Sequence, residues 1–138
     1  MIQQGQTTSF KQELYLGIHD LDTDVIKIAL YTANADLNYD TTIYSATDEI
    51  TGTGYTAGGK ILTGAVVSSS GTTAYVSFNN ATWTPASFTC RCALIYNSSK
   101  GNKSIAVLDF GSDKTATNTF TITFPANTAT SAIIRSSN

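Results

Sequence analysis

Residues 54–60 of this 138-residue chain contain a pattern that could bind phosphate. Their sequence, Gly-Tyr-Thr-Ala-Gly-Gly-Lys, matches the G-x-x-x-x-G-K opening of a P-loop. The next residue is Ile61, where a P-loop needs Ser or Thr to bind magnesium, and the motif precedes an expected strand instead of opening a helix. We therefore interpret it as a glycine-rich loop whose glycines allow positive φ angles and close packing, and we expect no nucleotide cofactor.

Asp20, Asp22 and Asp24 form a second pattern, which is similar to the D-x-D-x-D opening of a calcium-binding loop. Val25 stands where such a loop needs glycine, and Tyr31 stands where it needs a bidentate glutamate. The segment fits a solvated turn between a helix and a strand better than a metal site. A weak cation site at the three aspartates is the alternative.

His19 is the only histidine, and Cys90 and Cys92 are the only cysteines. A catalytic histidine needs a nucleophile and an orienting carboxylate, and the adjacent Asp20 points away on a helix end. We expect His19 to cap the last carbonyl groups of a helix. The two cysteines should point to one face of a strand as reduced, buried thiols. Because no established catalytic motif is present either, we do not expect an enzyme.

The elements that would position these residues begin with a short helix. Residues 1–8 are polar and are expected to form a flexible arm. Ser9 and Gln12 fit a capping box, and Phe10, Leu14 and Ile18 follow at helical spacing, with Leu16 broadening that apolar face. The helix should end near residues 17–19.

Beyond residue 24 the hydrophobic period changes from 3.6 to 2, which predicts strands. The expected strands are 25–32, 61–68, 72–78, 81–84, 88–97, 104–110, 119–124 and 132–135. Strand 25–32 should be half-buried, with Ile26, Ile28 and Leu30 facing inward. Residues 69–71, 98–103 and 111–113 should be turns, and residues 33–60 a long loop. Residues 9–138 are therefore predicted to be one mainly β domain, an antiparallel β-sandwich in which jelly-roll and immunoglobulin-like connections are both open.

The composition narrows the possible partners. Only 13% of the residues are charged and the net charge is −2, without any basic cluster. We therefore expect no binding to nucleic acid or to a membrane surface. No apolar run is long enough to cross a membrane, and no signal peptide is recognised, so synthesis in the cytoplasm is expected. A surface with few charges loses less side-chain entropy when a partner covers it, which favours an assembling or extracellular protein.

The aromatic residues divide into expected core and expected surface. Phenylalanines at alternating strand positions, and Trp83 on a short strand, should pack in the core. Tyr39, Tyr44 and Tyr55 lie in the long loop, and tyrosine is enriched at protein interfaces. We predict that these three tyrosines contact a partner.

Five segments resemble a family of small virion proteins of tailed bacteriophages. They are residues 9–14 (SFKQEL), 17–20 (GIHD), 26–32 (IKIALYT), 52–59 (GTGYTAGG) and 107–111 (VLDFG). The resemblance implies a structural component of the virion. With the composition, it favours a homo-oligomeric capsid decoration (cement) protein that binds the major capsid protein or other virion proteins. The alternatives are a tail, collar or fibre protein, and a glycan-binding module that uses exposed aromatics such as Tyr55 or Trp83.

Overall fold

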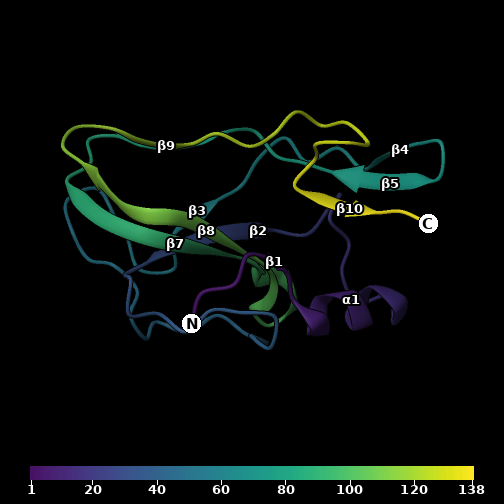
Figure 1. The fold of residues 1–138 in the computed structure, drawn as a ribbon, viewed down its shortest axis with the longest axis horizontal. Coiled ribbons are helices and arrows are strands. Elements are labelled where there is room, and N and C mark those ends of the chain that lie inside the picture. Colours follow the sequence, from purple (N-terminus) through teal and green to yellow (C-terminus); the bar gives the residue numbers. More distant parts are fainter.

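The computed structural model describes residues 1–138 as antiparallel sheets with one short helix (Figure 1). Strands make up 39% of the chain and helices 8%, so the mainly β prediction is confirmed. The largest sheet has five strands in the order β1-β8-β7-β2-β3. Their bounds are β1 Gly5–Gln6, β2 Ile26–Tyr31, β3 Lys60–Ile61, β7 Phe88–Asn97 and β8 Lys103–Ala116. No helix in this structure has the length and hydropathy of a membrane span.

Two smaller sheets complete the fold. One has the order β10-β5-β4, formed by β4 Ser68–Ser70, β5 Thr73–Val76 and β10 Ile134–Ser136. The other pairs β6 Ala81–Trp83 with β9 Phe120–Ile122. A short 3₁₀ helix, η1 (Ser98–Lys100), joins β7 to β8. In Figure 1 the β4, β5 and β10 strands lie at one end of the molecule, on the same side as helix α1 (Thr8–Tyr15).

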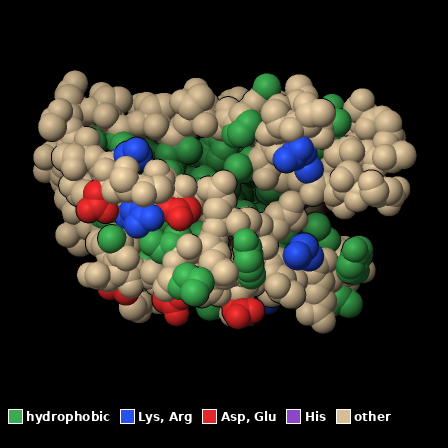
Figure 2. All heavy atoms as spheres, in the orientation of Figure 1, with side chains coloured by type: hydrophobic (Ala, Val, Ile, Leu, Met, Phe, Trp, Pro, Cys, Tyr) green, Lys and Arg blue, Asp and Glu red, His purple; other side chains and the backbone are tan.

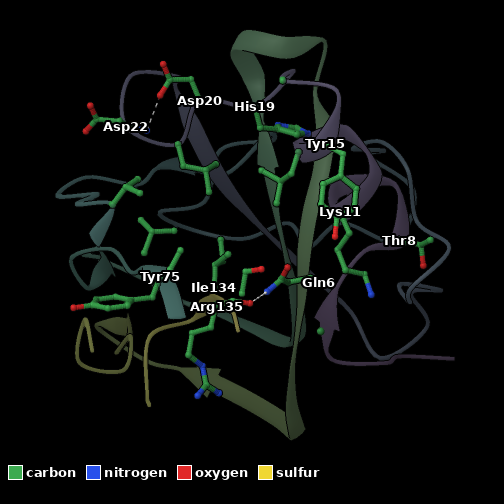
Figure 3. A pocket seen from close by; sticks show the side chains of 18 of the residues that line it. Gln6, Thr8, Lys11, Tyr15, His19, Asp20, Asp22, Tyr75, Ile134 and Arg135 are labelled. Carbon is green, nitrogen blue, oxygen red and sulfur yellow. Dashed lines mark hydrogen bonds between the residues drawn. The ribbon is translucent and has the colours of Figure 1, made fainter. Parts of the chain in front are cut away.

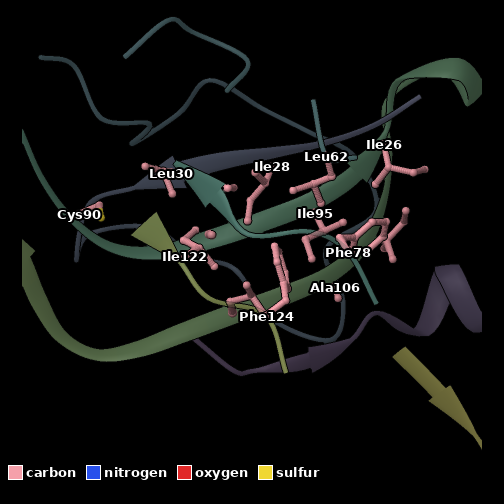
Figure 4. Close-up of a cluster of buried hydrophobic side chains, with 14 of the residues drawn as sticks. Ile26, Ile28, Leu30, Leu62, Phe78, Cys90, Ile95, Ala106, Ile122 and Phe124 are labelled. Carbon is pink, nitrogen blue, oxygen red and sulfur yellow. The ribbon is translucent and has the colours of Figure 1, made fainter. Parts of the chain in front are cut away.

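Hydrophobic side chains cover both faces of the five-stranded sheet. The larger cluster joins one face of β2, β7 and β8 to side chains of β6, β9 and the chain around β5, and Figure 4 shows its centre. The smaller cluster lies on the opposite face, where Ala29 and Tyr31 of β2 pack with Leu94 and Tyr96 of β7. Strand β2 is therefore buried on both faces, and the prediction of a half-buried strand was wrong. The reason is that the chain between β2 and β3 folds back over the sheet.

The first eight residues differ from the predicted flexible arm. Gly5 and Gln6 form β1, which pairs with Val107 and Ala106 of β8. Thr7 is fully buried, and its hydroxyl accepts a hydrogen bond from the backbone N–H of Phe10 at 3.3 Å. Thr7 is therefore the N-cap of α1, in place of Ser9. Because Thr7 is buried and caps the helix, it also holds the preceding strand β1 in place. Regular structure therefore begins at Gly5.

The predicted turn at residues 111–113 is absent, since β8 continues through it to Ala116. The ladder between β7 and β8 is irregular there: Cys90 pairs with Lys114 but Cys92 pairs with Asp109. This bulge turns Cys90 toward the larger cluster and Cys92 toward the smaller one, so the prediction that they share a face was wrong. Both thiols are free and buried, as expected. Burial raises the pKa of Cys92 to about 11 and that of Cys90 to about 12.

Candidate functional site

A hydrogen-bonded cluster centred on Glu49 holds the chain between β2 and β3 against the sheet. The Tyr44 hydroxyl donates to Oε1 of Glu49 at 2.6 Å. The Tyr55 hydroxyl and the backbone N–H of Gly58 both donate to Oε2, the latter at 2.8 Å. Tyr55 also accepts a hydrogen bond from the N–H of Leu30 in β2, at 3.0 Å. The cluster therefore joins three parts of the long loop to the central sheet.

The three tyrosines that the sequence offered as partner contacts thus have different positions. Tyr44 and Tyr55 are half-buried, and their hydroxyls bind Glu49 inside the protein. The Tyr44 ring also stacks on Tyr96, with 4.8 Å between the ring centres. Only Tyr39 is exposed, at 44%. Two of the three tyrosines therefore attach the loop through their hydroxyls, and a partner contact through Tyr39, Tyr44 and Tyr55 stays a prediction.

The glycine-rich segment packs against backbone, as its interpretation required. Gly59 has φ +82°, and a Cβ there would lie 1.8 Å from the carbonyl oxygen of Ile28. Gly54 has φ +86°, and a Cβ there would lie 1.9 Å from the carbonyl oxygen of Pro85. Lys60, the lysine of the P-loop pattern, places its amino group 5.8 Å from the ring centre of Trp83. Gly54 and Gly59 of residues 54–60 therefore serve close packing.

His19 belongs to a second polar network, which ties α1 to β7. Its ring is fully buried, with Nε2 2.9 Å from Oε1 of Glu13 and Nδ1 3.0 Å from the amide nitrogen of Asn97. The Asn97 oxygen accepts the N–H of Ser99, so its amide nitrogen is the donor to His19 Nδ1. His19 then carries its proton on Nε2 and donates it to Glu13. The expectation that His19 caps helix carbonyls was wrong, because its ring turns inward to these side chains.

Asp24 continues this network, and its carboxylate has protein donors on both oxygens. Asn97 donates to Oδ2 and Lys100 to Oδ1, each at 2.8 Å. Burial by itself raises the pKa of Asp24, but the hydrogen bonds from Asn97 and Lys100 outweigh it and hold the pKa at about 2. Asp20 accepts the N–H groups of Asp22 and Thr23 within the turn. The segment is therefore a hydrogen-bonded turn, and no group of three or more metal-binding side chains is gathered there.

A groove of about 1110 Å³ opens between α1 and the β5–β10 pair. Figure 2 shows hydrophobic side chains in this hollow, and Figure 3 shows the residues along it. Its apolar lining includes exposed residues from two elements: Leu14 and Tyr15 of α1, and Val66 and Val67 before β4. Tyr15 is 92% exposed. The groove therefore combines exposed apolar side chains with polar ones along its walls.

No sequence pattern predicted this groove. Leu14 and Leu16 were expected to pack inward with Phe10, but Phe10 is the only buried residue of the helix. The one available signal was the run Leu14-Tyr15-Leu16, because three consecutive apolar residues cannot all face one side of a helix.

Comparison of the chain with protein families, with curated proteins and with solved structures finds no significant match.

Proposed function

We propose that the chain is a structural component of a bacteriophage particle, most simply a capsid decoration protein on the outer shell of the head. The proposal of a phage particle rests on the five sequence segments that resemble small virion proteins. Its partners would be the major capsid protein or other virion proteins, with further copies of the chain itself. We also propose that the antiparallel sheets on the two sides of the larger hydrophobic cluster form one β-sandwich domain.

The observation that supports a binding role is the difference between the positions of the interior ionisable side chains and those of the exposed apolar ones. The ionisable groups of the interior hold elements of the fold together: Glu49 binds two tyrosines, and His19 and Asp24 join α1 to β7 and η1. Of the ten large hydrophobic side chains that are exposed, five line one groove: Leu14, Tyr15, Tyr39, Val66 and Val67. A protein whose function is to bind other subunits needs this arrangement, because apolar contact area supplies most of the affinity in protein association.

The positions of Tyr55 and Trp83 give the glycan-binding alternative little support. It required exposed aromatic rings such as those of Tyr55 and Trp83. Trp83 is 4% exposed in the larger hydrophobic cluster, and the Tyr55 hydroxyl binds Glu49. The Trp83 ring is therefore not available as a flat platform for a sugar.

The proposal is tested by adding the purified protein back to particles of a phage that lacks its gene. Free and bound protein are separated by sedimentation, with heads and tails analysed apart. We expect saturable binding to heads at a fixed number of copies per capsid protein. Unlabelled protein should compete, and heat-unfolded protein should not. Binding confined to tails would favour the tail, collar or fibre alternative, and absence of saturable binding to either part would reject the particle role.

A further inference from the structure

We infer that two copies of this chain associate through the groove between α1 and β10, about a two-fold axis. This inference deepens the oligomer part of the proposed function and rests on it only for the claim that copies associate. Of the residues that line the groove, four carry the argument: Lys11, Tyr15, Asp22 and Arg135.

The groove carries both acidic and basic side chains, so the grooves of two copies can be complementary in charge. In Figure 3, Asp20 and Asp22 lie at one end of the groove and Arg135 at the other, with Lys11 on the α1 wall. Lys11 and Asp22 are exposed, and neither side chain has an ion-pair partner within its own chain. A two-fold axis across the groove can bring the acidic end of one copy, with Asp22, against the α1 wall of the other, with Lys11. Each contact then occurs twice, as in any isologous interface.

The apolar residues of the groove provide the surface area that such an interface would bury. Tyr15 projects from α1 at the rim and is among the most exposed side chains, while Val66 and Val67 are more than half exposed on the facing wall. In a two-fold pair, the α1 rim of each copy can enter the groove of the other. A large aromatic side chain entering an apolar groove is typical of the residues that dominate binding energy.

A second copy fits this surface better than an added peptide strand does. Strand β10 has only three residues, and its neighbour on one side is β5. On its other side the Gln6 side chain already donates to the carbonyl oxygen of Arg135, at 3.1 Å. Strand addition needs a row of free backbone groups, and this short edge has one of its acceptors occupied.

Charge reversal tests the pairing directly. Lys11→Glu and Asp22→Lys each replace two attractive contacts of the symmetric pair with two repulsive ones, and each should weaken self-association by about 10-fold or more. A mixture of the two variants restores both contacts in a mixed pair. Sedimentation equilibrium should therefore find the wild type dimeric, each variant largely monomeric, and the equimolar mixture dimeric again.

Controls separate the interface from general charge effects and from misfolding. Asp113→Lys reverses an exposed acid on β8, outside the groove, and should leave the dimer unchanged. Tyr15→Ser removes an exposed ring and should weaken the dimer by about 10-fold, without lowering the melting temperature measured at concentrations where the wild type is also monomeric. A monomeric wild type, a dimer that resists both reversals, or a mixture that stays monomeric would each overturn the inference. None of these results would change the copy number of the protein in particles, so the particle role is tested separately.

Discussion

Replacing Gly59 by alanine should detach the glycine-rich loop from β2. The new Cβ would lie 1.8 Å from the carbonyl oxygen of Ile28 and 2.8 Å from the Cα of Ala29. Both atoms belong to the backbone of a buried central strand, so the loop must move instead, by about 1 Å, because a close-packed interior cannot absorb the overlap. The movement acts on the neighbouring contacts of Gly58, which donates to Glu49 and accepts from Tyr96.

The expected cost has two parts. An alanine held at a left-handed backbone angle costs about 1–2 kcal/mol. Three hydrogen bonds of Gly58 and Gly59 are placed at risk, each contributing about 1 kcal/mol. The free energy of unfolding should therefore fall by about 4–5 kcal/mol. Gly101→Ala is the matched control, because Gly101 also has a positive φ, +68°, but no atom within 4 Å of a new Cβ.

Urea denaturation of both variants measures the difference. Gly101→Ala should lose only the backbone part, about 1–2 kcal/mol, which leaves a gap of about 3 kcal/mol between the variants. For a chain of this length that gap corresponds to about 10 °C in melting temperature. If the two variants were equally stable, the close approach of the loop to β2 would be refuted.

Three further predictions concern the polar networks. Glu49→Ala leaves three donors without an acceptor and should lower the free energy of unfolding by about 3 kcal/mol, whereas Asp113→Ala, which removes an exposed carboxylate, should change it by less than about 0.5 kcal/mol. Asp24 has a folded pKa of about 2, below its unfolded value, so its contribution of about 2 kcal/mol is present above pH 4 and is lost as the pH falls toward 2. Asp24→Asn should therefore be less stable than the wild type at pH 7 and equally stable near pH 2. Burial and the Glu49 charge raise the pKa of Tyr96 to about 12, so stability present below pH about 10 should be lost toward pH 12, with tyrosine ionisation and loss of circular dichroism occurring together.

Each of these predictions has a result that contradicts it. Equal stability of Glu49→Ala and Asp113→Ala would mean that the Glu49 cluster does not attach the loop. A stability difference for Asp24→Asn that persists at pH 2 would assign its cost to packing instead of charge. Tyrosine ionisation centred near pH 10, with the circular dichroism unchanged, would show that Tyr96 is open to solvent.

The sequence predicted some strands correctly, because their side chains alternate without interruption, but the predicted strand 61–68 was wrong: β3 ends at Ile61 and the next strand, β4, begins at Ser68. Strand 88–97 was placed with correct bounds, and the hairpin at Gly71 was found from its turn residues. The errors occur where a distant part of the chain decides the outcome. Strand β2 gained a second buried face because the loop after it folds back, and residues 111–113 stayed in a strand because a bulge absorbs Gly111. A local pattern does not contain either of these long-range contacts.

The candidate site was less predictable for a similar reason. Tyr44 and Tyr55 were correctly placed in the loop between β2 and β3, but their burial depends on Glu49, a residue that no motif distinguishes. The groove depends on how α1 packs against β8 and faces β10, which are distant in the sequence. The residues did indicate one feature of this region correctly, which is that the glycines of residues 54–60 serve close packing.

The particle role is tested most directly by quantitative mass spectrometry of purified wild-type phage, with heads and tails separated. The proposal predicts hundreds of copies per particle, present with the heads in a fixed ratio to the major capsid protein. A dozen or so copies that follow the tails would contradict decoration of the capsid, and absence from the purified particle would contradict the virion role itself.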